Sequence, residues 1–244
     1  MLDNIPLKLI LTRNSDSACL LTANENQVKI VLEEISIHAR RVKLLDNVYV
    51  NLNNTLSKND AIYPFARSQV KTFTQPAGIR NICITNQLST PNIPVRVVVA
   101  LVSNAAYAGS KALNPYNFQP FHINYVDLKV NSKSVLTRPM TLNVANREYL
   151  EAYYNTLISM NYVGRDDGYY VDRDEFINGN FLLGFDLTPT LSNGPFADRT
   201  QTGKVDIELR FDRELEQTLS VIVYSQYQNH IIINKVRRVV KDFS

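Results

Sequence analysis

The chain has 244 residues, a mass of 27.8 kDa and a formal net charge of +3, from 26 Lys and Arg against 23 Asp and Glu. A chain of this length forms one or two domains and buries about 70–75% of its unfolded surface, and 45% hydrophobic residues exclude a disordered chain. The small charge does not by itself indicate nucleic-acid binding. Two cysteines, Cys19 and Cys83, exclude a disulfide framework and a four-thiolate zinc site.

Export and membrane insertion are not expected from the apolar pattern. The longest uninterrupted apolar run, Val97 to Val102, is six residues long, whereas a membrane-spanning helix needs about 20. Asp3 and Lys8 lie where a signal peptide has positive and apolar residues, respectively. We therefore expect both cysteines to be free thiols in a reducing compartment.

Most of the chain has the alternating pattern of β-strands. Early in the sequence, Val28–Ala39 alternates with a phase slip at Glu33–Glu34, which predicts a strand with a β-bulge. Late in the sequence, Lys204–Phe211 alternates without a fault and predicts a half-buried strand, whose inward residues are Val205, Ile207, Leu209 and Phe211. Other predicted strands are Ile5–Thr12, Gln69–Thr74, Asn81–Thr85, Val95–Ser103, Ile123–Val130, Phe181–Leu187, Leu219–Tyr227 and His230–Val240.

One segment, Asn146–Tyr162, has helical spacing. Its apolar residues recur at three- and four-residue intervals, Asn146 is the expected N-cap, and Gly164 follows the end. About ten short strands, long loops and one inserted helix predict an all-β fold, an antiparallel β-sandwich of jelly-roll type.

The spacings that suggest metal or phosphate binding lack the residues that these sites need. Taking Gly168 as the sixth residue of a calcium loop puts Val163 and Arg165 at ligand positions, and neither side chain can hold the ion. The Gly179 and Gly184 spacing of a P-loop lacks its lysine and hydroxyl. We expect no metal and no cofactor.

Catalytic residues are not indicated by any local signature. The histidines His38, His122 and His230 are far apart in sequence. A spatial pair of Cys19 or Cys83 with one of them stays open, although a structural cysteine is the commoner case. We expect no catalytic residue.

Two basic runs and a group of tyrosines are the candidate contact residues. The runs are Arg40-Arg41-x-Lys43 and Lys235-x-Arg237-Arg238 with Lys241. Either could meet phosphates or discourage edge-to-edge aggregation, and Arg237, Arg238 and Lys241 are the better candidates for nucleic-acid contact. The tyrosines serve the core, an interface or both; they are Tyr149, Tyr153, Tyr154, Tyr162, Tyr169 and Tyr170.

Five stretches together resemble a known family. The sequence resembles capsid-like proteins of Polinton/Maverick-type elements and related invertebrate double-stranded DNA viruses over nearly its whole length. The stretches are KLILTRNSDSACL, VKTFTQPAGI, PVRVVVALVSNAAYAGSKALNPYNFQPFHIN, NGNFLLGFDLTPTLSNG and GKVDIELRFDRELEQTLSVIVYSQYQNHIIINKVRRVVKDF. The resemblance implies a structural subunit of a double jelly-roll capsid, which trimerises into capsomers of a virion shell after an intracellular stage in the cytoplasm or nucleus of the host.

The family has a further jelly roll upstream, so this chain resembles a carboxy-terminal half. We expect residues 1–27 to be the end of, or link from, a preceding roll, and residues 28–244 to form the jelly-roll domain. Expected partners are further copies and other capsid proteins, including an amino-terminal jelly-roll half. The expected interface residues are Tyr153, Tyr154, Tyr162, Tyr169, Tyr170, Pro115, Tyr116 and Phe118. A single jelly-roll minor capsid or penton-like protein, and a lectin-like carbohydrate-binding module, are the alternatives.

Overall fold

The computed structural model describes residues 8–23, 28–88, 92–163, 171–188 and 201–241. The strands are β1 (Ala61–Gln75), β2 (Asn81–Thr85), β3 (Arg96–Ser103), β4 (Ile123–Val130), β5 (Lys133–Ser134), β6 (Met140–Thr141), β7 (Leu182–Asp186), β8 (Val205–Phe211), β9 (Leu219–Ile233) and β10 (Val239–Lys241). The helices are α1 (Asp16–Cys19), α2 (Asp46–Lys58), α3 (Asn104–Tyr107), α4 (Leu150–Ser159) and α5 (Arg173–Ile177).

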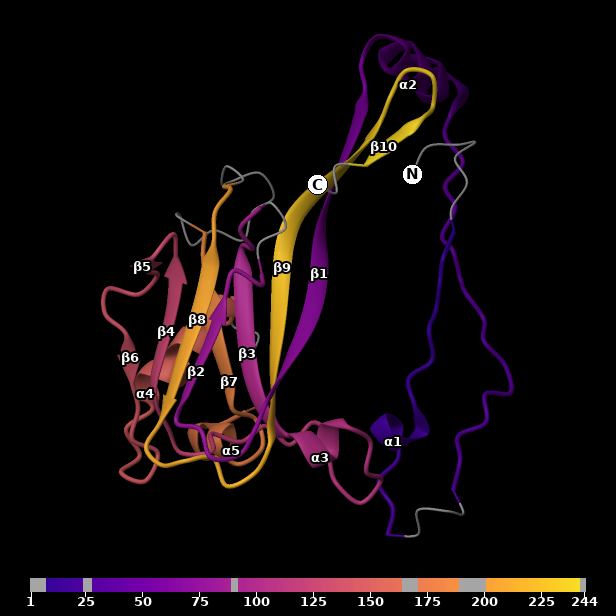
Figure 1. Cartoon of the computed structure of the whole chain (residues 1–244). Coiled ribbons are helices and arrows are strands. Elements are labelled where there is room, and N and C mark those ends of the chain that lie inside the picture. Colours follow the sequence, from indigo (N-terminus) through magenta and orange to yellow (C-terminus); the bar gives the residue numbers. More distant parts are fainter. Residues whose placement is uncertain (1–7, 24–27, 89–91, 164–170, 189–200, 242–244) are drawn as a thin grey trace.

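The strands form two antiparallel five-stranded sheets (Figure 1). The first sheet has the order β1-β9-β3-β7 with β10 on β9, and the second has the order β2-β8-β4-β5 with β6 on β4. Pairing is nested: β1 pairs with β9, β2 with β8, β3 with β7, and β4 with β5 and β6. This nested pairing, split between two facing sheets, is the jelly-roll topology and confirms the predicted fold class.

The core lies between the two sheets. In β8 the inward residues are those that the alternation predicts, and all four are buried: Val205, Ile207, Leu209 and Phe211. They pack in one hydrophobic cluster with apolar residues of β2, β3, β4, β7 and the first half of β9. The period-2 pattern therefore identifies the buried face wherever a strand has one sheet on one side and solvent on the other.

Some predicted strands have the same bounds in the structure, and two others form one continuous strand. Asn81–Thr85 and Ile123–Val130 have the predicted bounds. The two carboxy-terminal predictions instead form one long strand, β9, followed by the short β10. The chain stays extended through Gln228 and Asn229 because β1 pairs with β9 over its whole length.

The strand predicted at Val28–Ala39 is wrong. Residues 28–45 have no regular secondary structure, and the next element is the helix α2, which the sequence did not lead us to expect. Residues 8–12, from the strand predicted at Ile5–Thr12, are likewise not in a strand. Alternation shows that a segment is able to pair in a sheet, but pairing also needs a partner strand, and no other described segment pairs with this one.

The predicted inserted helix is present but starts later. Tyr149, not Asn146, precedes α4, because a turn holds the earlier residues: Asn143 and Glu148 exchange backbone hydrogen bonds, and Asn143 Oδ1 accepts from the Asn146 N–H at 3.1 Å. The helix packs against β7, where the Gly184 N–H donates to Thr156 Oγ1 at 3.1 Å. It therefore covers the edge of β7 that lies opposite its partner strand β3.

Candidate interaction surfaces

Residues 8–23 and 28–60, here called the arm, extend away from the sandwich (Figure 1). None of these described arm residues is fully buried. Sixteen large apolar side chains of the arm are exposed, and they are Leu9, Ile10, Leu11, Leu21, Val28, Val31, Leu32, Ile35, Ile37, Val42, Leu44, Leu45, Val48, Tyr49, Val50 and Leu52. The arm is the largest stretch of unpacked apolar surface in the part of the chain that the structure describes.

The arm contacts the rest of the chain at two places, one near α1 and one at α2. Near α1, the Thr22 N–H donates to the Lys111 carbonyl at 2.8 Å, and Lys111 Nζ donates to the Val28 carbonyl at 3.1 Å. At α2, Arg237 Nη2 donates to Asn53 Oδ1 at 2.9 Å. These polar contacts tie the arm to the sandwich without covering its apolar side chains.

Two of the α4 tyrosines belong to the core. Tyr149 is buried and its ring stacks on Phe176, with centroids 6.3 Å apart. Tyr153 is half-buried, meets Phe176 edge-on at 5.4 Å, and donates its hydroxyl to the Val171 carbonyl at 3.0 Å. These contacts explain both residues by packing within the chain.

Two other tyrosines of this group are exposed at the surface. Tyr154 is 50% exposed and Tyr162 is 39% exposed. Tyr169 and Tyr170 lie outside the described residues. The predicted interface role of all four stays a prediction, as does that of Tyr153.

The loop before β4 contains the other predicted interface residues. Tyr116 is 59% exposed and Pro115 is half-buried. Phe118 is fixed by backbone hydrogen bonds, since its N–H donates to the Gly179 carbonyl at 2.9 Å and its carbonyl accepts from the Phe181 N–H at 3.2 Å. Tyr116 is therefore presented outward by a loop that is anchored two residues away.

The basic carboxy-terminal run follows β9. Arg237 and Arg238 are exposed in the turn between β9 and β10, and Lys241 is the last residue of β10. Arg237 has a left-handed backbone with φ of 62°. The structure places this turn beside α2 of the arm, a neighbourhood that the sequence did not reveal.

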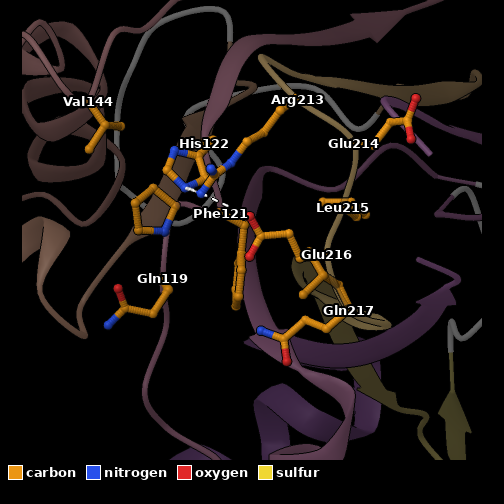
Figure 2. Close-up of a pocket in the computed structure, with 11 residues that line it drawn as sticks. Gln119, Phe121, His122, Val144, Arg213, Glu214, Leu215, Glu216 and Gln217 are labelled. Atoms are coloured by element: carbon orange, nitrogen blue, oxygen red, sulfur yellow. Dashed lines mark hydrogen bonds and ion pairs between the residues drawn. The ribbon is translucent and has the colours of Figure 1, made fainter. Parts of the chain in front are cut away.

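A pocket of about 300 Å³ opens at the opposite end of the sandwich, between the loop before β4 and the β8–β9 loop (Figure 2). Phe121 and His122 line it with φ of 47° and 62°, a conformation that costs roughly 1–3 kcal/mol at each such residue. Arg213 lies against Nε2 of His122 and forms an ion pair with Glu216 at 3.1 Å. The pocket thus combines the rings of Phe121 and His122 with side chains that donate or accept hydrogen bonds.

The outer face of the second sheet has a row of charges. Lys129 Nζ lies 2.8 Å from Glu208 Oε2 and 3.4 Å from Asp127 Oδ2, and Arg210 Nη2 lies 2.6 Å from Glu208 Oε1. Hydrogen bonds from Lys129 and then Arg210 lower the pKa of Glu208, while the hydrogen bond to Glu208 raises the pKa of Lys129. Every charge in the row has a partner, which indicates a structural role for it.

The cysteines and histidines lie on separate elements. Cys19 is in α1 and Cys83 is on the outer side of β2, both exposed, whereas His122 contacts Arg213. Among the residues that the structure describes, no group of three or more His, Cys, Asp and Glu is placed to hold a metal ion. Asp172 and Glu175, from the acidic cluster, form a capping box at the start of α5.

Sequence reasoning missed the arm as a surface, although α2 left a signal. Val48, Leu52 and Leu56 lie four residues apart, which is helical spacing, and Lys58 ends the helix. The alternation of Val28–Ala39 drew attention to strands instead. Within the described residues, no helix is long and apolar enough to cross a membrane.

No protein-family model matches the sequence. The chain is similar to an uncharacterised protein of Caenorhabditis elegans, with 25% identity over 248 residues that cover 99% of this chain and 59% of the worm protein. This chain therefore spans less than two thirds of that relative.

Three solved structures are similar to this chain over about three quarters of its length. A chain in the 3.5 Å cryo-EM structure of the Sputnik virophage matches 76% of this chain with a TM-score of 0.46 and 11% identity. PBCV-1 VP54, fitted into a Sputnik reconstruction, matches 77% with a TM-score of 0.43 and 8% identity, and the mavirus major capsid protein matches 75% with a TM-score of 0.40 and 13% identity. The matches cover 39%, 52% and 41% of those chains, respectively, so this chain is similar to a part of each.

Proposed function

We propose that the chain is a structural capsid protein: a jelly-roll capsomer subunit that assembles into a virion shell through its arm. The observation that carries this proposal is the arm, which presents sixteen exposed large apolar side chains beside a sandwich that has its own buried core. The resemblance of the sequence to Polinton/Maverick-type capsid proteins supports the same role. Such a role resides in surfaces and symmetry and requires no catalytic group.

The energetics of the arm favour a covered state. Ile10, Val42 and Leu45 are each 70–74% exposed. Burying one such side chain fully is worth about 1.5–3 kcal/mol, and a monomer rarely exposes apolar patches beyond a few hundred Å². Burial of the arm in an obligate interface, which commonly covers about 2,000–5,000 Å² in total, removes this cost.

The partners in this proposal are further copies of the chain, as a trimer or higher capsomer, and other capsid proteins, including an amino-terminal jelly-roll half. Residues 1–27 would then end or follow the preceding roll. The location is the virion, after an intracellular stage in the host cytoplasm or nucleus.

Light scattering at micromolar concentration, followed by electron microscopy for capsomers, tests the proposal. We expect an oligomer that the double substitution Val31→Lys with Ile35→Lys dissociates. The control Val70→Lys changes an equally exposed apolar residue on β1, outside the arm, and should leave the oligomer intact. A 27.8 kDa monomer that binds no hydrophobic dye would contradict the proposal, because its arm would be covered by the chain itself.

The pocket of Figure 2 favours a second candidate, a lectin-like carbohydrate-binding module. Sugar rings pack on aromatic faces and hydrogen-bond to amide, carboxylate and guanidinium groups, which here are Phe121, Gln217, Glu216 and Arg213. Saturation-transfer NMR with a panel of monosaccharides tests it. Binding that Gln217→Ala abolishes would support this candidate, and absence of binding by every sugar would remove it.

A further inference from the structure

Two basic runs that are about 190 residues apart in sequence lie on segments that lead to and from the outer end of the β1–β9 ladder. Ala61, at the start of β1, pairs with Ile233, at the end of β9, so the segments just before β1 and just after β9 leave the ladder together. Arg237 then donates to Asn53 of α2 at 2.9 Å. We call residues 40–60 and 234–241 the basic tip (Figure 1).

The basic tip holds more positive charge than the whole chain. It has six net charges, from eight cations (Arg40, Arg41, Lys43, Lys58, Lys235, Arg237, Arg238 and Lys241) and two anions (Asp46 and Asp60). Since the chain carries +3, the remaining residues carry −3. Positive charge is therefore concentrated in these two segments, a feature that the small net charge of the chain conceals.

The ion pairs of the described fold do not use these cations, although Arg237 donates a hydrogen bond to Asn53. None of the ion pairs between described residues involves a cation of the basic tip. Arg40, Arg41, Lys43, Lys58, Lys235, Arg237 and Arg238 are all exposed. Stability of the sandwich does not account for a concentration of like charges, which repel one another.

The turn that presents the carboxy-terminal run is ordered. Asn234 Oδ1 accepts from the N–H groups of Val236 and Arg238, at 3.2 and 2.8 Å, and the Asn234 N–H donates to the Arg238 carbonyl at 3.0 Å. With Arg237 in the left-handed region and bonded to Asn53, the turn between β9 and β10 holds the Arg237 guanidinium group in place. Less conformational freedom is then lost when an anion binds.

We propose that the basic tip binds the phosphate backbone of duplex DNA without sequence preference. Four of its eight cations are arginines, whose planar fork suits phosphate oxygens. An anionic membrane is the poorer fit. Membrane-binding helices carry their cations on the helix itself, whereas α2 contains the single cation Lys58.

The inference rests on the proposed capsid role and adds to it an end of the molecule that faces the genome. DNA binding is measured separately from assembly. Fluorescence anisotropy of a labelled duplex of about 30 base pairs, titrated at several salt concentrations, gives a slope of log K against log salt of about −0.9 for each phosphate neutralised. Replacing both Arg237→Gln and Arg238→Gln should make the slope less steep by about 2 and weaken binding roughly 10- to 100-fold at 0.1 M salt.

A second pair and a matched control complete the experiment. Arg40→Gln with Arg41→Gln should act like the first pair, since both runs belong to one surface. Lys133→Gln with Arg138→Gln removes the same charge from exposed residues near β5 and should change neither slope nor affinity. Thermal unfolding and light scattering of each variant confirm that fold and assembly are unchanged.

Three results would overturn the proposal: no binding of the wild-type chain to DNA, equal weakening by the control pair, or binding to phosphatidylserine vesicles that exceeds DNA binding and is lost in the same variants. A chain that binds DNA but remains a dye-free monomer would keep this inference and remove the capsid role. A chain that assembles without binding DNA would keep the capsid role and remove this inference.

Discussion

Gly184 of β7 lies in close contact with Thr156 of α4. A Cβ atom built at Gly184 would overlap Ser159 Oγ and would lie 3.0 Å from both Thr156 Cα and Ser159 Cβ, tighter than most Cβ contacts in proteins. The Gly184 N–H also donates to Thr156 Oγ1. The absence of a side chain at this position thus lets the inserted helix dock directly on the sheet.

We predict that Gly184→Ala destabilises the chain by about 1–3 kcal/mol, because α4 must move outward to make room. Thr156→Val keeps the volume but leaves the buried Gly184 N–H without its acceptor, and should cost a similar amount, about 1–3 kcal/mol. Urea unfolding measures both. A Gly184→Ala stability within about 0.5 kcal/mol of wild type would show that the helix is not held this tightly.

The stability contributed by Glu208 should depend on pH. Hydrogen bonds from Lys129 and Arg210 lower the pKa of Glu208 in the folded chain. The contribution is therefore fully present above the pKa of the unfolded carboxyl and is lost as the pH falls through the lower folded pKa.

Glu208→Gln should accordingly cost about 0.5–1 kcal/mol at neutral pH, and this difference from wild type should stay constant down to about pH 5 and shrink as the pH falls below about 4.3, the pKa of an unfolded Glu. Urea unfolding across that range measures it. Glu216→Gln, at a carboxylate whose side chain is 72% exposed, serves as the control and should show a smaller change. A pH-independent difference for Glu208→Gln would contradict the prediction.

Two adjacent tyrosines of α4 should behave differently. Tyr153→Phe leaves the Val171 carbonyl without its partner and should cost about 0.5–1.5 kcal/mol of stability. Tyr154→Ala, at a half-exposed residue, should change stability by less than about 0.5 kcal/mol while weakening assembly if this ring is part of the interface. Unfolding curves and light scattering separate the two effects, and an unchanged oligomer would remove Tyr154 from the predicted interface.

The β4–β5 hairpin offers a stabilising change. Val130 pairs with Lys133, so Asn131 and Ser132 form a two-residue turn, and their φ angles of 50° and 67° are those of a type I′ turn. Ser132→Gly removes the steric cost of a left-handed side chain and should stabilise by about 0.5–1 kcal/mol. A lower melting temperature would indicate that the serine side chain has a contact outside the turn.

The sequence was informative where a strand has one buried face, as in β8, whose four inward residues are all in the core. It was misleading at Val28–Ala39. The alternation there is typical of a strand, but no described strand pairs with this segment. The prediction of Asn146 as N-cap was wrong for a local reason, because the Asn146 N–H donates to Asn143 Oδ1 within a turn that precedes the helix. Predicting these outcomes requires knowing the competing partners, which a single segment does not contain.

The contact surfaces were less accessible to sequence reasoning than the fold. Residues lining the pocket, such as His122 and Arg213, come from loops about ninety residues apart, and Asn53 meets Arg237 across most of the chain. Their proximity follows from the nested strand pairing, because Ala61 pairs with Ile233 and Ile123 with Phe211. Alternation predicts which strands exist but does not state which ones pair.

The long β1–β9 ladder has a consequence for how the protein opens. Leu219, Val221 and Val223 of β9 belong to the main core cluster, whereas Tyr227 and Ile233 are buried outside it. The β1–β9 pair thus packs in the main core at one end and outside it at the other. We expect the outer part of the pair, nearest α2, to open locally while the core of the sandwich stays packed. Amide protons along this single strand should accordingly exchange with solvent at two distinct rates, slow from Leu219 to Val223 and faster toward Ile233, so that the end bearing the arm fluctuates while the sandwich remains closed.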